Sequence, residues 1–112
     1  MIHYHNRIFK PVSTSSNAEV TEDTIFHYKQ TEDRVQCSYK SKAILEGHLL
    51  GTVDEHGVIT MVYHQINTKG ELMTGRCTST PEVMSNGKIR IHESWQWTSG
   101  DLSEGTSVLE EI

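Results

Sequence analysis

Three turns that close with glycine divide the second half of the chain into segments of similar length. The glycines are Gly57, Gly70 and Gly87, and each ends a short polar stretch between two β-compatible runs. The pair Asn86-Gly87 is typical of a type I′ hairpin turn, in which both central residues have positive φ. Short turns of this kind join antiparallel strands that are neighbours in a sheet. The turns therefore predict a sequential antiparallel meander.

The runs between the turns alternate between apolar and polar residues, as half-buried strands do. The clearest alternation places one set of residues on the apolar face of a strand: Ala43, Leu45, Gly47, Leu49, Gly51 and Val53. We expect strands over residues 2–10, 24–30, 35–39, 43–53, 58–66, 71–79, 82–85, 88–97 and 105–112. Pro11 is expected to end the first strand, and Pro81 to begin the short one at 82–85. Residues 11–23 are predicted to form the longest loop.

The composition supports strands rather than helices. The 112 residues include only two alanines and six leucines, but 23 serines and threonines. An open sheet of eight or nine strands would leave exposed edges and an uncovered apolar face, and closure removes both problems. We predict a single all-β domain over residues 1–112, a meander closed into a small up-and-down barrel. Its architecture would be similar to lipocalin-like or avidin-like barrels, and a two-sheet β-sandwich is the alternative.

Charge and hydropathy exclude several classes of partner. The net charge is −5, whereas nucleic acids and anionic membranes both need a basic face. No stretch approaches the 18 apolar residues of a membrane-spanning helix, and residues 1–10 have no apolar signal region. We therefore expect a cytoplasmic protein with no nucleic-acid or membrane partner. In that compartment Cys37 and Cys77 are expected to be buried free thiols.

The most informative strand is the one expected at 88–97. Ile89, Ile91, Glu93, Trp95 and Trp97 fall on one face of it, so a carboxylate lies among inward-facing apolar residues. A buried carboxylate needs a partner or has a raised pKa.

Two hypotheses follow for Glu93. In the first, Glu93 forms a structural ion pair with Arg76, the nearest cation by topology. In the second, Glu93 and Arg76 line a ligand pocket with Trp95 and Trp97 as its walls.

Other chemical signals are weak. The chain has seven histidines, and His3 and His5 are spaced to share one face of a strand, which can chelate a metal. However, no cysteine or carboxylate lies at ligand spacing beside them, so we predict no metal site and no cofactor. The sequence contains no CxxC, HExxH, GxGxxG, Walker A or GxSxG motif, and we assign no catalytic residue.

Several segments resemble a small family of uncharacterised bacterial proteins. These are residues 4–6 (YHN), 47–57 (GHLLGTVDEHG), 69–75 (KGELMTG) and 86–112. Members of that family are often labelled N-acetylglutamate synthase, which would imply an acetyltransferase that uses acetyl-CoA and glutamate. The chain has no [RQ]xxGx[GA] loop, the pattern that holds the coenzyme A pyrophosphate at a helix N-terminus in the usual acetyltransferase fold.

These observations leave three hypotheses for function. The leading one is non-catalytic binding of a small molecule inside the barrel or at its mouth. The second is an interaction module that forms a homodimer. The third is the acetyltransferase that the resemblance implies.

Overall fold

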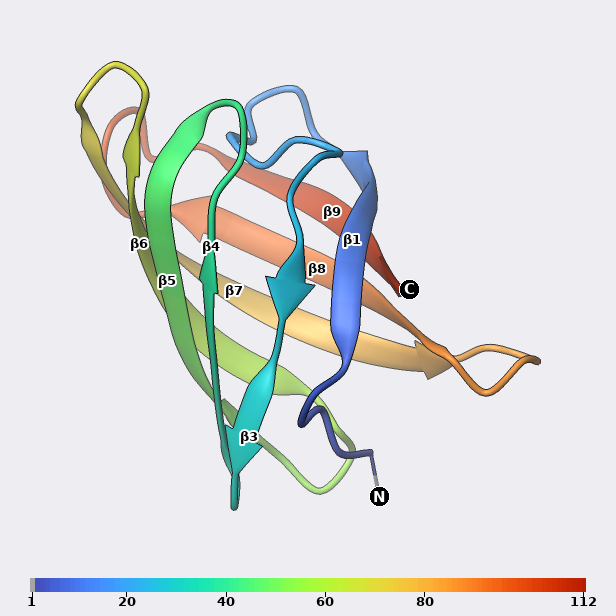
Figure 1. Ribbon diagram of the computed structural model, residues 1–112. Coiled ribbons are helices and arrows are strands. Elements are labelled where there is room, and N and C mark those ends of the chain that lie inside the picture. Colours follow the sequence, from blue (N-terminus) through green and yellow to red (C-terminus); the bar gives the residue numbers. More distant parts are fainter. Residues whose placement is uncertain (1) are drawn as a thin grey trace.

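Nine antiparallel strands follow one another along the chain and form one sheet (Figure 1). The structure is a computed structural model that describes residues 2–112, so Met1 of the predicted domain lies outside the described residues. The strands are β1 (Ile8–Thr14), β2 (Phe26–His27), β3 (Lys29–Thr31), β4 (Arg34–Tyr39), β5 (Ile44–Val53), β6 (Ile59–Asn67), β7 (Leu72–Val83), β8 (Ile89–Trp97) and β9 (Glu104–Glu111). Their order in the sheet is β2-β1-β9-β8-β7-β6-β5-β4-β3.

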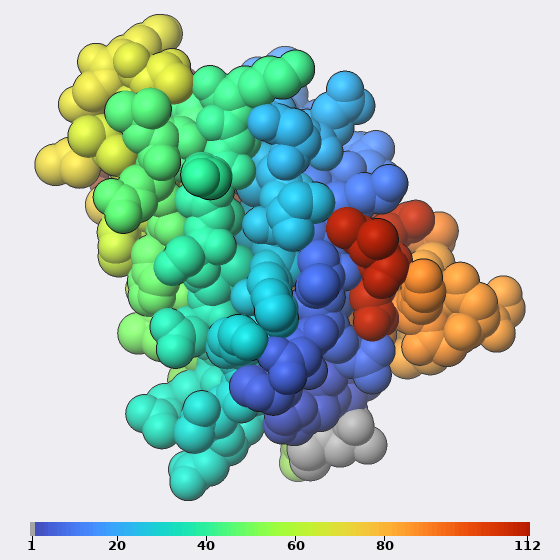
Figure 2. Space-filling view, in the orientation of Figure 1, coloured from blue at the N-terminus to red at the C-terminus, as the bar shows by residue number. Residues whose placement is uncertain are grey.

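The two ends of this sheet are the same stretch of chain. β2 and β3 are separated only by Tyr28, and they pair with β1 and β4 respectively. Around Tyr28 the backbone bonds to the chain before β1: its N–H donates to the Arg7 carbonyl over 3.0 Å, and the Asn6 N–H donates to the Tyr28 carbonyl over 2.9 Å. The sheet therefore closes into the predicted barrel. Figure 2 shows this side of the molecule, where β1 (blue) and the 24–31 segment (light blue to turquoise) lie side by side.

The hairpins are confirmed, but the turn type at Asn86-Gly87 is not. Gly57, Gly70 and Gly87 have φ of 80°, 79° and 83°, and Asn86 is not among the described residues with positive φ. The Gly87 N–H donates to the Met84 carbonyl over 2.9 Å, and the Met84 N–H donates to the Lys88 carbonyl over 2.8 Å. This pattern is a type I turn followed by a left-handed glycine in a bulge, for which only the glycine needs positive φ.

Both prolines lie inside strands, contrary to prediction. β1 continues past Pro11, which pairs with Leu109 beside a bulge, so the strand runs over 8–14 rather than 2–10. β7 runs through Pro81 to Val83 as one strand, where we predicted two. The pairing of β7 with β6 ends at Ser79, so Pro81 has a strand neighbour only on the β8 side. Proline is tolerated at both places because each is a bulge or a free strand edge.

A bulge in β5 corrects the face of one residue. The register with β6 shifts between Ile44 and Glu46. As a result Ile44 is buried, whereas Leu45, predicted to face inward, is 58% exposed. Beyond the bulge the predicted face is confirmed, with Gly47, Leu49 and Gly51 buried.

One end of the barrel is filled by side chains. The rings of Tyr4, Phe9 and Tyr28 pack together, with centroids 5.2 to 6.3 Å apart. The Tyr4 hydroxyl donates to the Gly57 carbonyl over 2.5 Å, which ties the N-terminal segment to the β5–β6 turn. The aliphatic residues of this filled half are Val35, Ile59, Ile89, Ile91 and Leu109, all at most 1% exposed.

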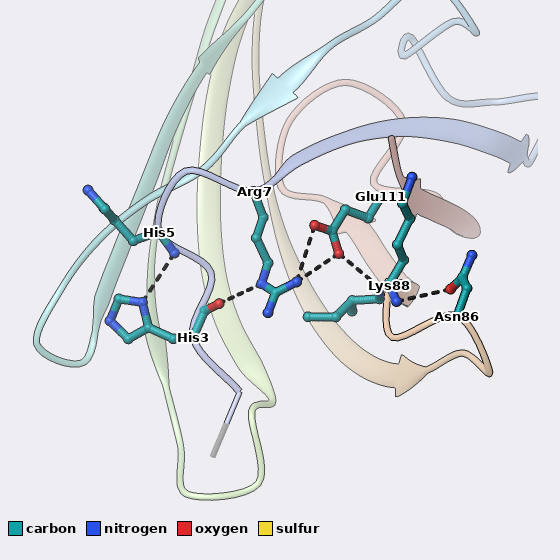
Figure 3. Close-up of polar contacts among 7 residues, drawn as sticks. His3, His5, Arg7, Asn86, Lys88 and Glu111 are labelled. Carbon is teal, nitrogen blue, oxygen red and sulfur yellow. Dashed lines mark hydrogen bonds and ion pairs between the residues drawn. The ribbon is translucent and has the colours of Figure 1, made fainter.

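An ion pair fastens the chain ends at this filled end. The Arg7 guanidinium donates to both Glu111 carboxylate oxygens, over 2.9 and 3.2 Å, and to the His3 carbonyl (Figure 3). Glu111 also accepts the Ile89 backbone N–H over 3.0 Å. The N-terminal segment is thereby held against β8 and β9. Residues 2–112 form no helix of the length and apolarity needed to cross a membrane.

The filled half should account for most of the stability. Ile91 is 0% exposed, so Ile91→Ala should lower the free energy of unfolding by about 2–5 kcal/mol through lost burial and a residual cavity. Leu72 is 78% exposed, so Leu72→Ala should change it by less than about 0.5 kcal/mol. Urea unfolding measures both values. Equal losses in the two variants would contradict the assignment of the core.

Candidate functional site

The other half of the barrel contains a cavity of about 50 Å³ that is open in part to solvent. That space has room for several water molecules or one small ligand. The lining comes from the barrel strands and from the loop after β1: Ala18, Glu19, Val20, Phe26, Tyr39, Leu49, Met61, Tyr63, Gln65, Cys77, Glu93, Trp95, Trp97 and Ser107. The barrel is thus filled at one end and hollow toward the other.

Glycines on neighbouring strands give the wall aromatics room to lie flat. Tyr39 pairs directly with Gly47, and Trp95 pairs with Gly105. An added Cβ would lie 2.5 Å from the ring at either glycine. Aromatic–glycine cross-strand pairs are a recognised device for fixing register and covering a bare strand. Here they keep large rings along the wall and out of the centre.

The third pair of this kind joins β6 to β7. Tyr63 lies opposite Gly75, and a Cβ at Gly75 would overlap the Tyr63 ring. The Tyr63 ring in turn meets Trp97 edge-on, with centroids 5.7 Å apart, and Trp97 meets Trp95 at 5.8 Å. Edge-to-face contacts at these distances are favourable aromatic geometry. They connect β6 and β8 into a continuous aromatic wall.

The loop after β1 is fastened over this end of the barrel. The Glu19 carboxylate accepts from the side-chain amides of Gln65 and Asn67, both over 2.7 Å. Asn17 donates to the Ser103 hydroxyl over 2.9 Å, and its carbonyl accepts the Trp97 indole N–H over 3.1 Å. Charge-assisted bonds of this length are the stronger kind. The loop and the barrel rim are therefore held together on both sides.

Glu93 lies between the two halves of the barrel, and its carboxylate has few hydrogen-bond donors around it. Within residues 2–112 its one hydrogen bond is from the Ser79 hydroxyl, over 3.4 Å, which is long for a bond to a carboxylate. The side chain is half-buried, and it lines the cavity. Burial raises the pKa of Glu93 to about 7, and the Ser79 contact opposes this only in part. The Glu93 carboxyl group is therefore partly protonated and partly ionised near neutral pH.

Tyr28 is a second residue with a buried polar group, and that group lacks a hydrogen-bond partner. Tyr28 Oη is the one buried side-chain oxygen or nitrogen in residues 2–112 without a hydrogen bond. Burial raises the pKa of Tyr28 well above its usual value, and the Glu93 charge adds to that shift. Tyr28 therefore has unused hydrogen-bonding capacity, but it is fully buried against Tyr4 and Phe9 and does not line the cavity.

The structure supports three of the four predicted pocket residues as lining residues. Glu93, Trp95 and Trp97 face the cavity, as the alternation of β8 indicated. Arg76 does not, because it lies on the outer face between inward-facing Gly75 and Cys77. Its guanidinium donates to Gln96 Oε1 over 2.7 Å at the surface. The predicted Glu93–Arg76 ion pair is therefore wrong.

The cysteines and histidines form no second centre. Cys37 and Cys77 are buried free thiols, and burial raises the pKa of both, that of Cys37 to about 12. His3 and His5 lie before β1 rather than in a strand, and His5 Nδ1 accepts the Gln30 N–H over 3.0 Å. Within residues 2–112 there is no group of three or more residues placed to hold a metal ion.

Comparison with known proteins agrees with this barrel. The family model described as "Avidin-like protein" matches residues 2–112. The chain belongs to the avidin-like protein family. No curated protein and no solved structure matches this avidin-like chain. The homodimer of the second sequence hypothesis stays untested.

Several residues that line the avidin-like cavity are not predicted from local sequence patterns. The alternation pattern predicts strands at Tyr39, Tyr63 and Gln65 but no site, and Glu19 lies in the loop predicted over residues 11–23. The available signal for the tyrosines was glycine on the apolar face of the adjacent strand, as at Gly47 and Gly75. No local pattern indicates that Glu19 bonds to Gln65, 46 positions away.

The Gly75–Tyr63 pair gives a prediction for the cavity wall. Gly75→Ala should displace the Tyr63 ring toward the cavity and lower the free energy of unfolding by about 1–3 kcal/mol through overpacking. It should also change the tryptophan emission, because Tyr63 contacts Trp97. Thr78→Ala on the outer face of β7 is the matched control and should change stability by less than about 0.5 kcal/mol. The wall geometry is wrong if both variants behave alike.

The position of Glu93 gives a pH-dependent prediction. Its pKa is about 7 in the folded protein against 4.5 ordinarily, so the folded state holds the proton more tightly. The stability from protonated Glu93 is complete below pH 4.5 and is lost as the pH rises to 7. Glu93→Gln removes this loss, so at pH 8 it should be more stable than the natural protein by about 3 kcal/mol.

The same comparison at pH 4 provides the control. There both forms carry a neutral side chain at position 93, so their unfolding free energies should agree within about 0.5 kcal/mol. Urea unfolding at the two pH values measures this. A Glu93→Gln variant that is less stable than the natural protein at pH 8 would show that Glu93 has a structural partner instead.

Proposed function

We propose that this avidin-like protein binds one small organic molecule in the hollow half of its barrel and releases it chemically unchanged. The observation that carries the proposal is the combination of an aromatic-walled cavity with a carboxyl group, Glu93, that has only one long hydrogen bond. Ligand sites are typically apolar clefts with a few polar groups that fix orientation. Barrels with about this number of strands, streptavidin among them, hold one small ligand in this way.

The energetics of Glu93 support a binding role. At pH 8 the Glu93 carboxylate is largely ionised and has little hydrogen bonding, so it lowers the stability of the barrel. A neutral residue at this position would not carry that cost. Residues that lower the stability of the folded protein are typical of functional sites, because they are kept for activity rather than for stability.

The cavity does not favour the acetyltransferase hypothesis. Of the lining residues, none is a lysine, arginine or histidine, the side chains that would hold the phosphates of coenzyme A. The lining thiol, Cys77, has a raised pKa through burial, so it is a poor nucleophile. Both features point to binding without group transfer.

The two tryptophans make the binding test direct. They are the only tryptophans in the chain, and both line the cavity, so a bound ligand should change the intrinsic emission. We expect at least one of four probes (biotin, benzylamine, benzyl alcohol and benzoate) to give a saturable emission change. That probe should also raise the Tm with concentration, by about 2.7 kcal/mol of stabilisation at 100 times its Kd.

Recovery of the bound probe separates binding from catalysis. After incubation with the protein, the probe should be unchanged in mass. The proposal fails if none of the four probes at millimolar concentration alters either the emission or the Tm. A coupled assay with acetyl-CoA and glutamate should show no turnover above background.

A further inference from the structure

The carboxylates that line the cavity differ in how many hydrogen bonds they accept. Glu19 and Glu93 are its two carboxylates. Both oxygens of Glu19 accept amide donors over 2.7 Å, so Glu19 is committed to the loop. Glu93 has one contact, over 3.4 Å, although an ionised carboxylate has about four acceptor positions. Glu93 is therefore the group with capacity for a ligand.

The basic residues of the barrel lie elsewhere. The lining residues of the described chain carry two carboxylates and no cation. Alternation along the strands puts Arg76 and His64 on the outside, and His92 also points outward to Glu82. An anion entering the cavity would meet like charge in a medium of low dielectric constant, which is costly. The cavity therefore selects against anionic ligands.

The walls suit a positive charge as well. A cation over the face of tryptophan or tyrosine is attracted by the ring quadrupole, more strongly when it is desolvated. Trp95, Trp97, Tyr39 and Tyr63 all present rings to the cavity. The glycine opposite three of these rings keeps them flat along the wall, with their surfaces rather than bulky side chains toward the centre.

We propose that the ligand of the cavity is a small organic cation of the primary-amine class, with Glu93 as its counter-ion and the aromatic wall as its second contact. This inference rests on the proposed function and specifies its ligand. A primary ammonium group has three donors, which match the free acceptor positions of Glu93. A cavity of about 50 Å³ has room for the ammonium group and the carbon beside it, so the rest of the ligand, such as the ring of benzylamine, lies at the open side of the cavity.

The charge state of Glu93 makes the binding pH-dependent. The groups whose charges couple to it are phenols and a thiol from the surrounding elements: Tyr28, Tyr39, Tyr63 and Cys77. All four have pKa values raised by burial, so they stay neutral below pH 9. Cys37 on β4 is likewise neutral, and Glu19 is the remaining carboxylate of the lining. Lowering the pH from 8 to 5 therefore protonates Glu93 and should weaken amine binding by about tenfold or more.

The test compares three probes with one ring and different charges. Benzylamine is a cation, benzyl alcohol is neutral and benzoate is an anion. Calorimetric titration of the full chain at pH 8 should give a Kd for benzylamine at least about tenfold lower than for the other two. At pH 5 this preference should disappear.

Two variants identify the counter-ion. Glu93→Gln should abolish the preference for benzylamine while the protein stays folded, since we expect this variant to be at least as stable at pH 8. Glu46→Gln removes the same charge from the exposed face of β5 and should leave the preference intact. Equal effects of the two variants would mean that only the overall negative field attracts the amine, and would overturn the role of Glu93.

The outcomes separate this inference from the proposed function. If benzyl alcohol or benzoate binds as tightly as benzylamine to the natural protein, the cation proposal is wrong, although small-molecule binding stands. If biotin alone binds, the same conclusion follows. If none of the probes binds, the proposed function fails and the inference fails with it.

Discussion

The shape of the cavity depends on the pairing of three wall aromatics with glycines on neighbouring strands. Tyr39, Tyr63 and Trp95 lie opposite Gly47, Gly75 and Gly105. A barrel of this size has an interior just wide enough for side chains, so large residues would ordinarily fill it. With the rings held flat, the hollow half has aromatic walls and an empty centre. The rings of Tyr4, Phe9 and Tyr28 and the neighbouring aliphatic side chains fill the other half.

A second constraint is the position of Glu93 at the boundary between the halves. The β8 alternation places its carboxyl group inward, where burial raises its pKa to about 7. Ser79 provides one long contact, and the structure gives the carboxylate no cation. The fold thus tolerates a group that is costly when ionised. We interpret the free-energy cost of ionised Glu93 as a consequence of its role in ligand binding. A bound ligand that pairs with Glu93 would replace this cost with a favourable interaction.

Much of this architecture could be predicted from the sequence. Strict alternation in residues 89–97 assigned Glu93 and the two tryptophans to the inner face, and the glycine turns predicted the meander. The same alternation placed Arg76 between Gly75 and Cys77 and should have excluded it as a partner. Its selection rested on proximity in topology alone, which does not determine the face of a strand.

Other features depend on contacts that no local pattern contains. The bulge at Ile44 and Glu46 turned Leu45 outward, and an unbroken alternation could not indicate it. Proline in β1 and β7 is compatible with the sheet only because β1 has a bulge there and β7 extends beyond β6. The Glu19 contacts join a loop to β6 across 46 and 48 positions. Long-range contacts of this kind become visible only when the barrel is closed.

The central claim is that Glu93 lines the barrel cavity and that no cation among residues 2–112 pairs with it. Its carboxyl carbon, observed by carbon-13 NMR during a pH titration of the ligand-free protein, reports this directly. The account predicts a titration midpoint near pH 7. A midpoint at or below the usual glutamate value of 4.5 would contradict it, because that result requires a solvent-exposed carboxylate or a charged partner.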